Sequence, residues 1–328
     1  MNESIKKPLY FYTKNSKDFN FQKLNEENLD LARQICVRNM LIQRKLELII
    51  AKFNEKKINY IILKGFHLIN TIYPSGVRSM EDIDILINPK DYLKVDEILN
   101  TLNYEKCVFI LSLKIHQNFS KKITYQDNLS PAIPVDIHLS LGPYPYLGKL
   151  NYSFLFEKIE SIKVNALEIN VLLPELLLIH LCLHSFSHIH ENSNSHSCDI
   201  ISVVRYYNYK FDWSFFIKTV KNFGLIMPVK HSIYRAISYE NFEIPVNLKK
   251  IFENYQPSFF EKFIFNYSLN NINDTDKYPI QYISTPGILK KIKLIPQIIY
   301  PGKVFLKSYF NKSYIKYIKN ILTLFKNL

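Results

Sequence analysis

Three aspartates in apolar surroundings are the residues of this chain whose types and spacing best suit catalysis. Asp82 and Asp84 lie in a segment that alternates polar and apolar residues, and Asp136 lies within Val135-Asp136-Ile137-His138. Alternate side chains of a β-strand share a face, which places Asp82 and Asp84 about 7 Å apart on one face. Carboxylates this close repel each other unless a cation lies between them, and their oxygens suit Mg²⁺ or Mn²⁺. We therefore predict Asp82, Asp84 and Asp136 as catalytic residues and metal ligands, since a lone buried aspartate is costly.

A basic residue next to a glycine indicates a phosphate site near the first strand. Lys64-Gly65 follows an apolar run and precedes a predicted helix. The free N–H groups and the dipole of a helix start attract phosphate, and Lys64 adds a positive charge. Arg78, four residues before Asp82, could reach an anionic substrate or pair with a nearby acid. A plain strand-to-helix turn would also explain Lys64-Gly65, and Asp82 and Asp84 could be ordinary solvent-facing residues of a strand. These alternatives stay open.

Several histidines could contribute to the same site. His180, His184 and His188 recur at every fourth position of a predicted helix, along one stripe. A zinc site is one interpretation, but no His-Glu-x-x-His motif and no cysteine at ligand spacing accompany them. We favour a lining role in the cleft between two domains, with His184 and His188 contacting nucleotide or acceptor. His138 shares a strand face with Asp136 and could orient it, contact substrate, or simply be hydrogen-bonded at the edge of the site.

Hydrophobic periodicity indicates the elements that position these residues. Helices are predicted over 24–56, 66–73, 89–102, 175–190, 197–208, 212–223 and 303–326, and strands over 58–63, 82–87, 104–110, 120–126 and 133–139. Asp199 stands near the start of one of these helices and is predicted to cap it. The fold class is therefore α+β. We expect a helical N-terminal arm over 1–56, a mixed αβ domain over 57–172, and a helical C-terminal domain over 173–328.

Composition places the chain among folded globular proteins. Hydrophobic residues make up 47% of 328 residues and charged residues 22%, a balance that excludes a mostly disordered chain. Four cysteines without Cys-x-x-Cys spacing are typical of reduced cytosolic thiols. No signal peptide and no apolar run of membrane-spanning length is recognisable. We therefore expect a cytoplasmic protein without a transmembrane span.

The positive charge is concentrated at the C-terminal end. The net charge is +13, and residues 277–328 contain ten lysines and no acidic residue. The predicted helix over 303–326 carries lysines on one face and apolar residues on another, so it could contact nucleic acid or an anionic membrane. A last helix packed on the body with a solvated lysine face explains the same pattern.

A combination of motifs resembles a known family. The segments YIILKGFHLINTIYPSGVRSMEDIDILI, VDIHLSL and LLLIHLCLHSFSH are similar to the uncharacterised nucleotidyltransferase family of the DNA polymerase β-like superfamily. The resemblance covers about residues 58–200. It implies a polymerase β-like nucleotidyltransferase domain, a small mixed sheet with flanking helices.

The resemblance also implies a reaction. A nucleoside triphosphate would lie with its phosphates at the Gly65 turn, with Mg²⁺ or Mn²⁺ on Asp82 and Asp84, and Asp136 as third ligand or as base. An acceptor would attack the α-phosphate in line, and pyrophosphate would leave, with two metals stabilising both oxygens. The usual Gly-Ser pair of the superfamily is Gly65-Phe66 here, so no serine hydroxyl would contact the phosphates.

The expected function is metal-dependent transfer of a nucleoside monophosphate to a hydroxyl of a small molecule or a protein. One alternative is modification of RNA ends, including those of tRNA, with the basic tail holding the acceptor. Another is a nucleotide- or partner-binding protein without catalysis, including one at a membrane surface. The acceptor, the nucleotide and the oligomeric state do not follow from the sequence.

Overall fold

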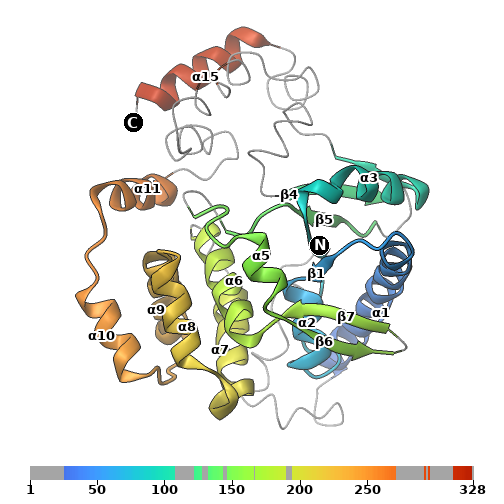
Figure 1. Cartoon of the computed structure of the whole chain (residues 1–328), viewed down its shortest axis with the longest axis horizontal. Helices are drawn as coiled ribbons and strands as arrows, with labels where there is room; N and C mark the ends of the chain where they lie inside the picture. The colour runs from blue at the N-terminus through green and yellow to red at the C-terminus, as the bar shows by residue number, and fades with distance from the viewer. Residues whose placement is uncertain are drawn as a thin grey trace.

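A mixed seven-stranded sheet lies between two groups of helices (Figure 1). The computed structural model describes residues 26–107, 122–127, 132–142, 146–165, 167–189, 194–270, 292, 295 and 313–326. The strands are β1 (Tyr60–Ile62), β2 (Ile83–Ile87), β3 (Tyr104–Lys106), β4 (Lys122–Asp127), β5 (Val135–His138), β6 (Ile159–Val164) and β7 (Leu167–Leu172), and the sheet order is β3-β4-β5-β2-β1-β7-β6. The predicted α+β fold, a mixed sheet with flanking helices, is confirmed.

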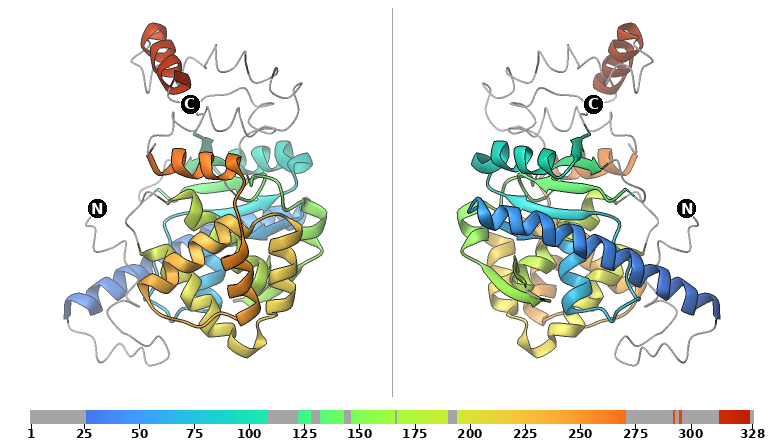
Figure 2. Two further views of the ribbon diagram at one scale, coloured as in Figure 1. Left: turned by 90° about the vertical axis from the view of Figure 1, so that its left-hand side faces the viewer. Right: turned by 90° about the vertical axis from the view of Figure 1, so that its right-hand side faces the viewer.

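The described helices account for most of the remaining chain. They are α1 (Glu26–Glu55), α2 (Lys64–Thr71), α3 (Tyr92–Thr101), α5 (Tyr152–Phe156), α6 (Pro174–Ser187), α7 (Ser195–Tyr207), α8 (Trp213–Asn222), α9 (Ile226–Tyr239), α10 (Val246–Asn254), α11 (Phe259–Asn270) and α15 (Tyr314–Lys326), with 3₁₀ turns η5 (Pro89–Asp91) and η6 (Asn208–Lys210). The long helix α1 runs diagonally across one face of the sheet (Figure 2). Helices α6, α7 and α9 lie side by side on its other side (Figures 1 and 2).

The pairing at the centre of the sheet positions the polar residues. β2 runs parallel to β5 and antiparallel to β1, and β4 runs antiparallel to β5. In this register Asp84 is the cross-strand partner of Asp136, and Leu86 is the partner of His138. Neighbouring strands of a sheet lie about 4.8 Å apart, so the two aspartates face the same side at close range.

Alternation along the central strands divides the core in two. Ile83, Ile85 and Ile87 belong to the hydrophobic cluster that includes α1 and α3. Leu86 and Ile61 point the other way, into the cluster built mainly by α6 to α9. Each such fully buried side chain stabilises the fold by about 1.5–3 kcal/mol. Asp84 and Asp136 share the Leu86 face, so the polar cluster faces the C-terminal helices.

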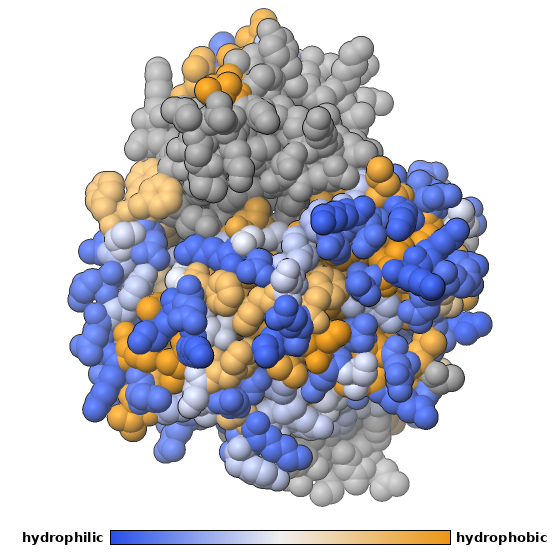
Figure 3. All heavy atoms as spheres, in the orientation of Figure 1, coloured by the Kyte–Doolittle hydropathy of each residue, from blue (hydrophilic) through white to orange (hydrophobic). Residues whose placement is uncertain are grey.

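Helix α6 is the central element of that second core. Eleven of its 14 residues are buried, including the run of leucines at its start. A helix that is apolar on all sides is stable only when it is surrounded, and α7, α8 and α9 pack around it. None of the described helices has both the length and the apolar character needed to cross a membrane. On the face drawn in Figure 3, hydrophilic and hydrophobic side chains are interspersed.

Most predicted elements are found close to their predicted bounds. The helix expected over 24–56 is α1, and the strands expected over 82–87 and 133–139 are β2 and β5. The hairpin of β6 and β7 and the short helix α5 were not predicted. The partial alternation of polar and apolar residues in Ile159–Val164 was the available signal for the hairpin. Its turn places Asn165 at a φ of 55°. The strand residues expected at 108–110 and 120–121 and the helix residues expected at 303–312 lie outside the described residues, and the three-part division of the chain stays a prediction.

Candidate active site

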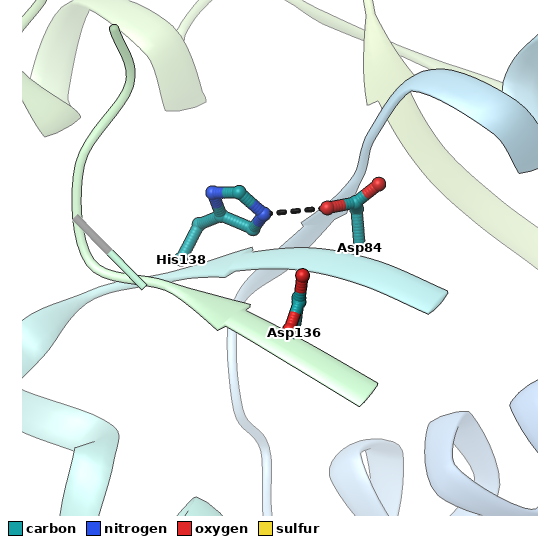
Figure 4. Close-up of side chains that lie close together, drawn as sticks. All are labelled: Asp84, Asp136 and His138. Carbon is teal, nitrogen blue, oxygen red and sulfur yellow. Dashed lines mark hydrogen bonds and ion pairs between the residues drawn. The ribbon is translucent and has the colours of Figure 1, made fainter. Parts of the chain in front are cut away.

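A buried polar cluster lies on the sheet face that is turned toward the C-terminal helices. Asp84 comes from β2, and Asp136 and His138 come from β5 (Figure 4). Their exposed fractions are only 5%, 2% and 6%. One ligand atom of each lies within 4.8 Å of the others. Within the described residues, this is the group of three or more such side chains that could hold a metal ion.

Asp84 is held by two hydrogen bonds to the same oxygen. Lys64 Nζ donates to Oδ1 at 2.9 Å, and Nε2 of His138 lies 2.6 Å from it. Because a carboxylate only accepts, the imidazole donates through Nε2–H. Burial raises the pKa of Asp84, but the charge of Lys64 and the bond from His138 outweigh it and hold that pKa below its usual range. Asp84 is therefore an ionised carboxylate.

Lys64 reaches Asp84 from a strained backbone position. It is the first residue of α2, and its φ of 41° lies in the left-handed region. Such a conformation costs a residue with a side chain about 1–2 kcal/mol. Strain of this kind is found preferentially at functional sites. The conformation places a buried ammonium group directly at the carboxylate of β2.

Asp136 is held by two residues of β4 that the sequence did not indicate. Thr124 Oγ1 donates to Oδ1 at 2.6 Å, and Lys122 Nζ contacts Oδ2. Burial lowers the pKa of Lys122, but the charge of Asp136, its hydrogen bond and the charges of Asp84 and Asp82 together outweigh burial, so the net pKa is raised. Lys122 and Thr124 alternate along a predicted strand, which was the only local signal. Their role depends on the antiparallel pairing of β4 with β5.

Asp82 lies just before β2, next to the cluster but not within the group of three. It accepts no hydrogen bond from the described residues. The negative charge of Asp84, followed by burial, raises the pKa of Asp82 to about 7, and Lys64 offsets this only in part. An unpaired carboxylate beside two others is the environment that a divalent cation relieves. The oxygen and imidazole donors of Asp84, Asp136 and His138 therefore fit a divalent metal, and the role of Asp82 as a metal ligand stays a prediction.

Gly65 and Arg78 are brought into contact. A Cβ atom on Gly65 would lie 2.9 Å from NH1 of Arg78 and 3.3 Å from Cγ of Met80. Only a residue without a side chain allows Arg78 to approach the start of α2 this closely. The phosphate-binding role predicted for both residues stays a prediction, and NH1 is the guanidinium nitrogen that lies at the Gly65 turn.

The other side of Arg78 is bound to Asp199, a residue whose predicted role was wrong. Nε and NH2 of Arg78 each donate to one oxygen of Asp199 at 2.8 Å. Burial lowers the pKa of Arg78, but Asp199 raises it more, so the guanidinium stays charged. Tyr73 also donates to Asp199, and Ser202 donates to Tyr73, both at 3.0 Å. Asp199 is the fifth residue of α7 and not its cap; 121 residues separate it from Arg78, so no local signal indicates the pair.

Three histidines gather at the adjoining ends of α6 and α7. The ring centroids of His184 and His188 are 4.6 Å apart, and those of His196 lie 4.8 and 5.2 Å from them. Burial, and next the charge of Lys64, hold the pKa of His184 well below its usual value. The lining role of His184 and His188 stays a prediction. His196 was not identified from the sequence.

The predicted stripe of histidines differs from the observed one. Helix α6 ends at Ser187, so His188 lies at its C-terminal cap and not within the helix. His180 is buried in the middle of α6. The histidine rings of the described residues do not bring three ligand atoms within 4.8 Å of one another, so the zinc interpretation gains no support from this arrangement.

Comparisons with known proteins agree with the motifs. A family model described as uncharacterised nucleotidyltransferase matches residues 10–238. The crystal structure of the lincosamide antibiotic adenylyltransferase LnuA, lincomycin-bound, has a TM-score of 0.35 and 16% identity over 49% of this chain and 94% of that one. An antigenic nucleotidyltransferase-like protein from Paracoccidioides brasiliensis has a TM-score of 0.35 and 13% identity over 68% of this chain and 93% of that one. A search of curated proteins finds no match. The family match, which spans most of the chain, is the comparison that carries weight.

Proposed function

The chain belongs to the uncharacterised nucleotidyltransferase family, and we propose that it transfers a nucleoside monophosphate from a nucleoside triphosphate to an acceptor hydroxyl, releasing pyrophosphate. The observation that supports this proposal is the polar cluster of the sheet. Asp84 and Asp136 are adjacent on parallel strands, and Asp82 stands beside them without a hydrogen-bond donor among the described residues. The ammonium groups of Lys64 and Lys122 neutralise only part of the negative charge of the three carboxylates, which favours binding of a further cation.

The metal expected at this cluster is Mg²⁺ or Mn²⁺. Asp84, Asp136 and His138 are the residues that would hold it, with Asp82 adjoining. A divalent cation bound there would neutralise the negative charge that develops on the phosphate oxygens during transfer. Asp82 and Asp84 were predicted as the principal ligands, and we retain both as required for activity.

Residues around the start of α2 are proposed to bind the triphosphate. The N–H groups at Gly65 and the charge of Lys64 lie beside the cluster. Arg78 presents NH1 to the same turn while Asp199 holds its other two nitrogens. Phosphate oxygens accept hydrogen bonds strongly from such cationic donors. The triphosphate would then lie between this turn and Asp84.

Asp136 is the proposed base for the acceptor hydroxyl. Thr124 and Lys122 fix the orientation of its carboxylate from β4. The acceptor would approach from the side of the C-terminal helices, where His184 and His188 lie. We propose a small molecule or a protein as acceptor, because the described site contains no element typical of RNA recognition.

The first test is transfer of label from each α-³²P nucleoside triphosphate with Mg²⁺ or Mn²⁺. Total RNA, cell-extract protein and small-molecule extract serve as separate acceptors. We expect Asp82→Asn to reduce transfer to background while circular dichroism and melting remain those of a folded protein. Asp30→Asn, an exposed acid on α1, is the matched control and should keep full activity.

The outcomes separate the proposed function from its alternatives. Full activity of Asp82→Asn would exclude the proposed site. Label that appears only in the RNA fraction would assign the chain to RNA modification. Metal-dependent nucleotide binding without release of pyrophosphate in any fraction would favour a binding protein without catalysis.

A further inference from the structure

We propose that His138 is a metal ligand and that its imidazole makes this site select Mn²⁺ over Mg²⁺. The inference rests on the proposed function and concerns the identity of its metal. The imidazole lies on the same face of β5 as Asp136 and reaches across to Asp84 on β2 (Figure 4). Three side chains from two adjacent strands thus converge on one point of the sheet face.

The distances bring the three side chains within reach of one ion. His138 Nε2 lies 2.6 Å from Oδ1 of Asp84, and one atom from each of the three side chains lies within 4.8 Å of the others. Ligand atoms that share an ion are about 3 Å apart, because each lies about 2.0–2.2 Å from it. An ion held between Asp84 and Asp136 therefore lies within reach of Nε2.

The hydrogen bond from His138 is not needed to hold either carboxylate in place. Lys64 already donates to Oδ1 of Asp84 at 2.9 Å. Thr124 and Lys122 already engage both oxygens of Asp136. The imidazole is thus a fourth donor to a pair of carboxylates that have partners of their own. Its nitrogen is available to an ion, provided that the ring proton lies on Nδ1 in the metal-bound form.

An imidazole ligand changes which ion is preferred. Mg²⁺ is small, prefers oxygen ligands in octahedral geometry and gives up water reluctantly. Transition metals accept imidazole nitrogen readily, and Mn²⁺ combines this with acceptance of carboxylate oxygen. A site made of carboxylates alone favours neither ion strongly on ligand type, whereas two carboxylates with one imidazole favour Mn²⁺.

The test measures direct coordination as well as affinity. Untagged full-length protein is freed of metal and loaded with Mn²⁺ in the presence of a non-hydrolysable ATP analogue. Electron spin echo envelope modulation of the bound Mn²⁺ is expected to show coupling to an imidazole ¹⁴N nucleus. Mg²⁺ affinity is measured by competition against Mn²⁺. The variant is His138→Gln, which keeps a hydrogen-bond donor and offers a harder oxygen, and His231→Gln on α9 is the control.

His138→Gln should lose the ¹⁴N coupling, and its preference for Mn²⁺ over Mg²⁺ should fall about tenfold. His231→Gln should match the unaltered protein in both respects. Mn²⁺ that binds without imidazole coupling would overturn the inference while leaving the proposed function intact. An equal loss of affinity for both metals in His138→Gln would do the same, because that result is expected of a residue that only orients Asp84. Failure of the unaltered protein to bind either metal would overturn the metal-dependent function itself. Melting curves of each variant identify loss of fold.

Discussion

At the scale of single residues, the cluster is a set of carboxylates with unequal support. Asp84 has Lys64, and Asp136 has Lys122 and Thr124. Asp82 has no hydrogen-bond donor among the described residues, and its pKa is raised to about 7 mainly by Asp84. A site with only a structural role would avoid such repulsion between carboxylates, whereas a site that binds an additional cation is expected to contain it. The imbalance at Asp82 therefore supports the proposal that a metal ion binds beside it.

A buried histidine near the site predicts how stability depends on pH. His67 on α2 is fully buried, and neither ring nitrogen has a hydrogen-bond partner among the residues that the structure describes. Glu160 lies 3.7 Å from Nε2, which is too far for a hydrogen bond. Burial lowers the pKa of His67 to about 4. The unfolded chain therefore takes up this proton at a higher pH than the folded protein does.

The sign of the effect follows from that difference. The contribution of neutral His67 is complete above about pH 6.5 and is lost as the pH falls toward 4, by about 2–3 kcal/mol. His67→Leu removes this loss. Urea unfolding at pH 7.5 and pH 4.5 should show a smaller decrease in His67→Leu than in the unaltered protein. Equal decreases in both would show that His67 is protonated in the folded state without cost.

At the scale of elements, the Arg78–Asp199 pair joins the segment before β2 to helix α7. Both oxygens of Asp199 accept from Arg78, and Tyr73 adds a third donor. A bidentate pair of this kind restricts orientation more strongly than a single ion pair does. The pair therefore fixes the guanidinium beside Gly65 and fixes α7 against the sheet at the same time.

Removal of both partners should cost less stability than the two single removals added together. Asp199→Leu leaves a buried guanidinium without a counter-charge and is expected to lower the free energy of unfolding by about 3–5 kcal/mol. Arg78→Met/Asp199→Leu together should cost less than the sum of the single changes. Chemical denaturation of the four proteins in this double-mutant cycle measures the coupling. Additive losses would show that the two side chains do not stabilise each other.

At the scale of the whole molecule, the sheet separates two hydrophobic cores. One contains α1 and α3, and the other contains α6 to α9. The polar cluster lies on the face of the second core, so the C-terminal helices form one side of the approach to the site. The basic C-terminal helix α15 lies at the end of the molecule beyond α3 and α11 (Figures 1 and 2).

The proposed acceptors predict that the charges of α15 are dispensable for transfer. Lys316 and Lys319 are exposed there. Replacing both with glutamine in the full-length chain should leave transfer to a small molecule or a protein unchanged. Lys249→Gln/Lys250→Gln on α10, where both residues are exposed, is a control with equal loss of charge.

An RNA acceptor predicts a different result from the same variants. Each lost phosphate contact lowers the salt dependence of single-strand binding by about 0.7 in logarithmic slope. Filter binding over a range of salt concentrations measures this slope. A slope lowered by the α15 changes and not by the α10 changes would contradict a small-molecule or protein acceptor and support the RNA alternative.

The parts of the fold and of the site that could be predicted are those that have a local pattern in the sequence. The period of apolar residues predicted α1, and alternation around Asp84 predicted β2. The prediction that Asp199 caps a helix was wrong because the partner of Asp199 comes from a distant segment. The β6–β7 hairpin was missed because its polar residues obscure the apolar pattern of a half-buried hairpin. When a distant segment buries a residue, the residues next to it in the sequence do not indicate this burial.

By itself the sequence determined which residues are chemically suited to the site and which strands and helices carry them, because propensity and periodicity act over a few residues. Tertiary structure alone decided that β5 lies parallel to β2 with Asp136 opposite Asp84, that β4 supplies Lys122 and Thr124, and that α7 supplies Asp199. Strand order and register depend on burying the apolar faces of distant segments together. The donor set of the site, with His138 in it, is a product of that long-range pairing.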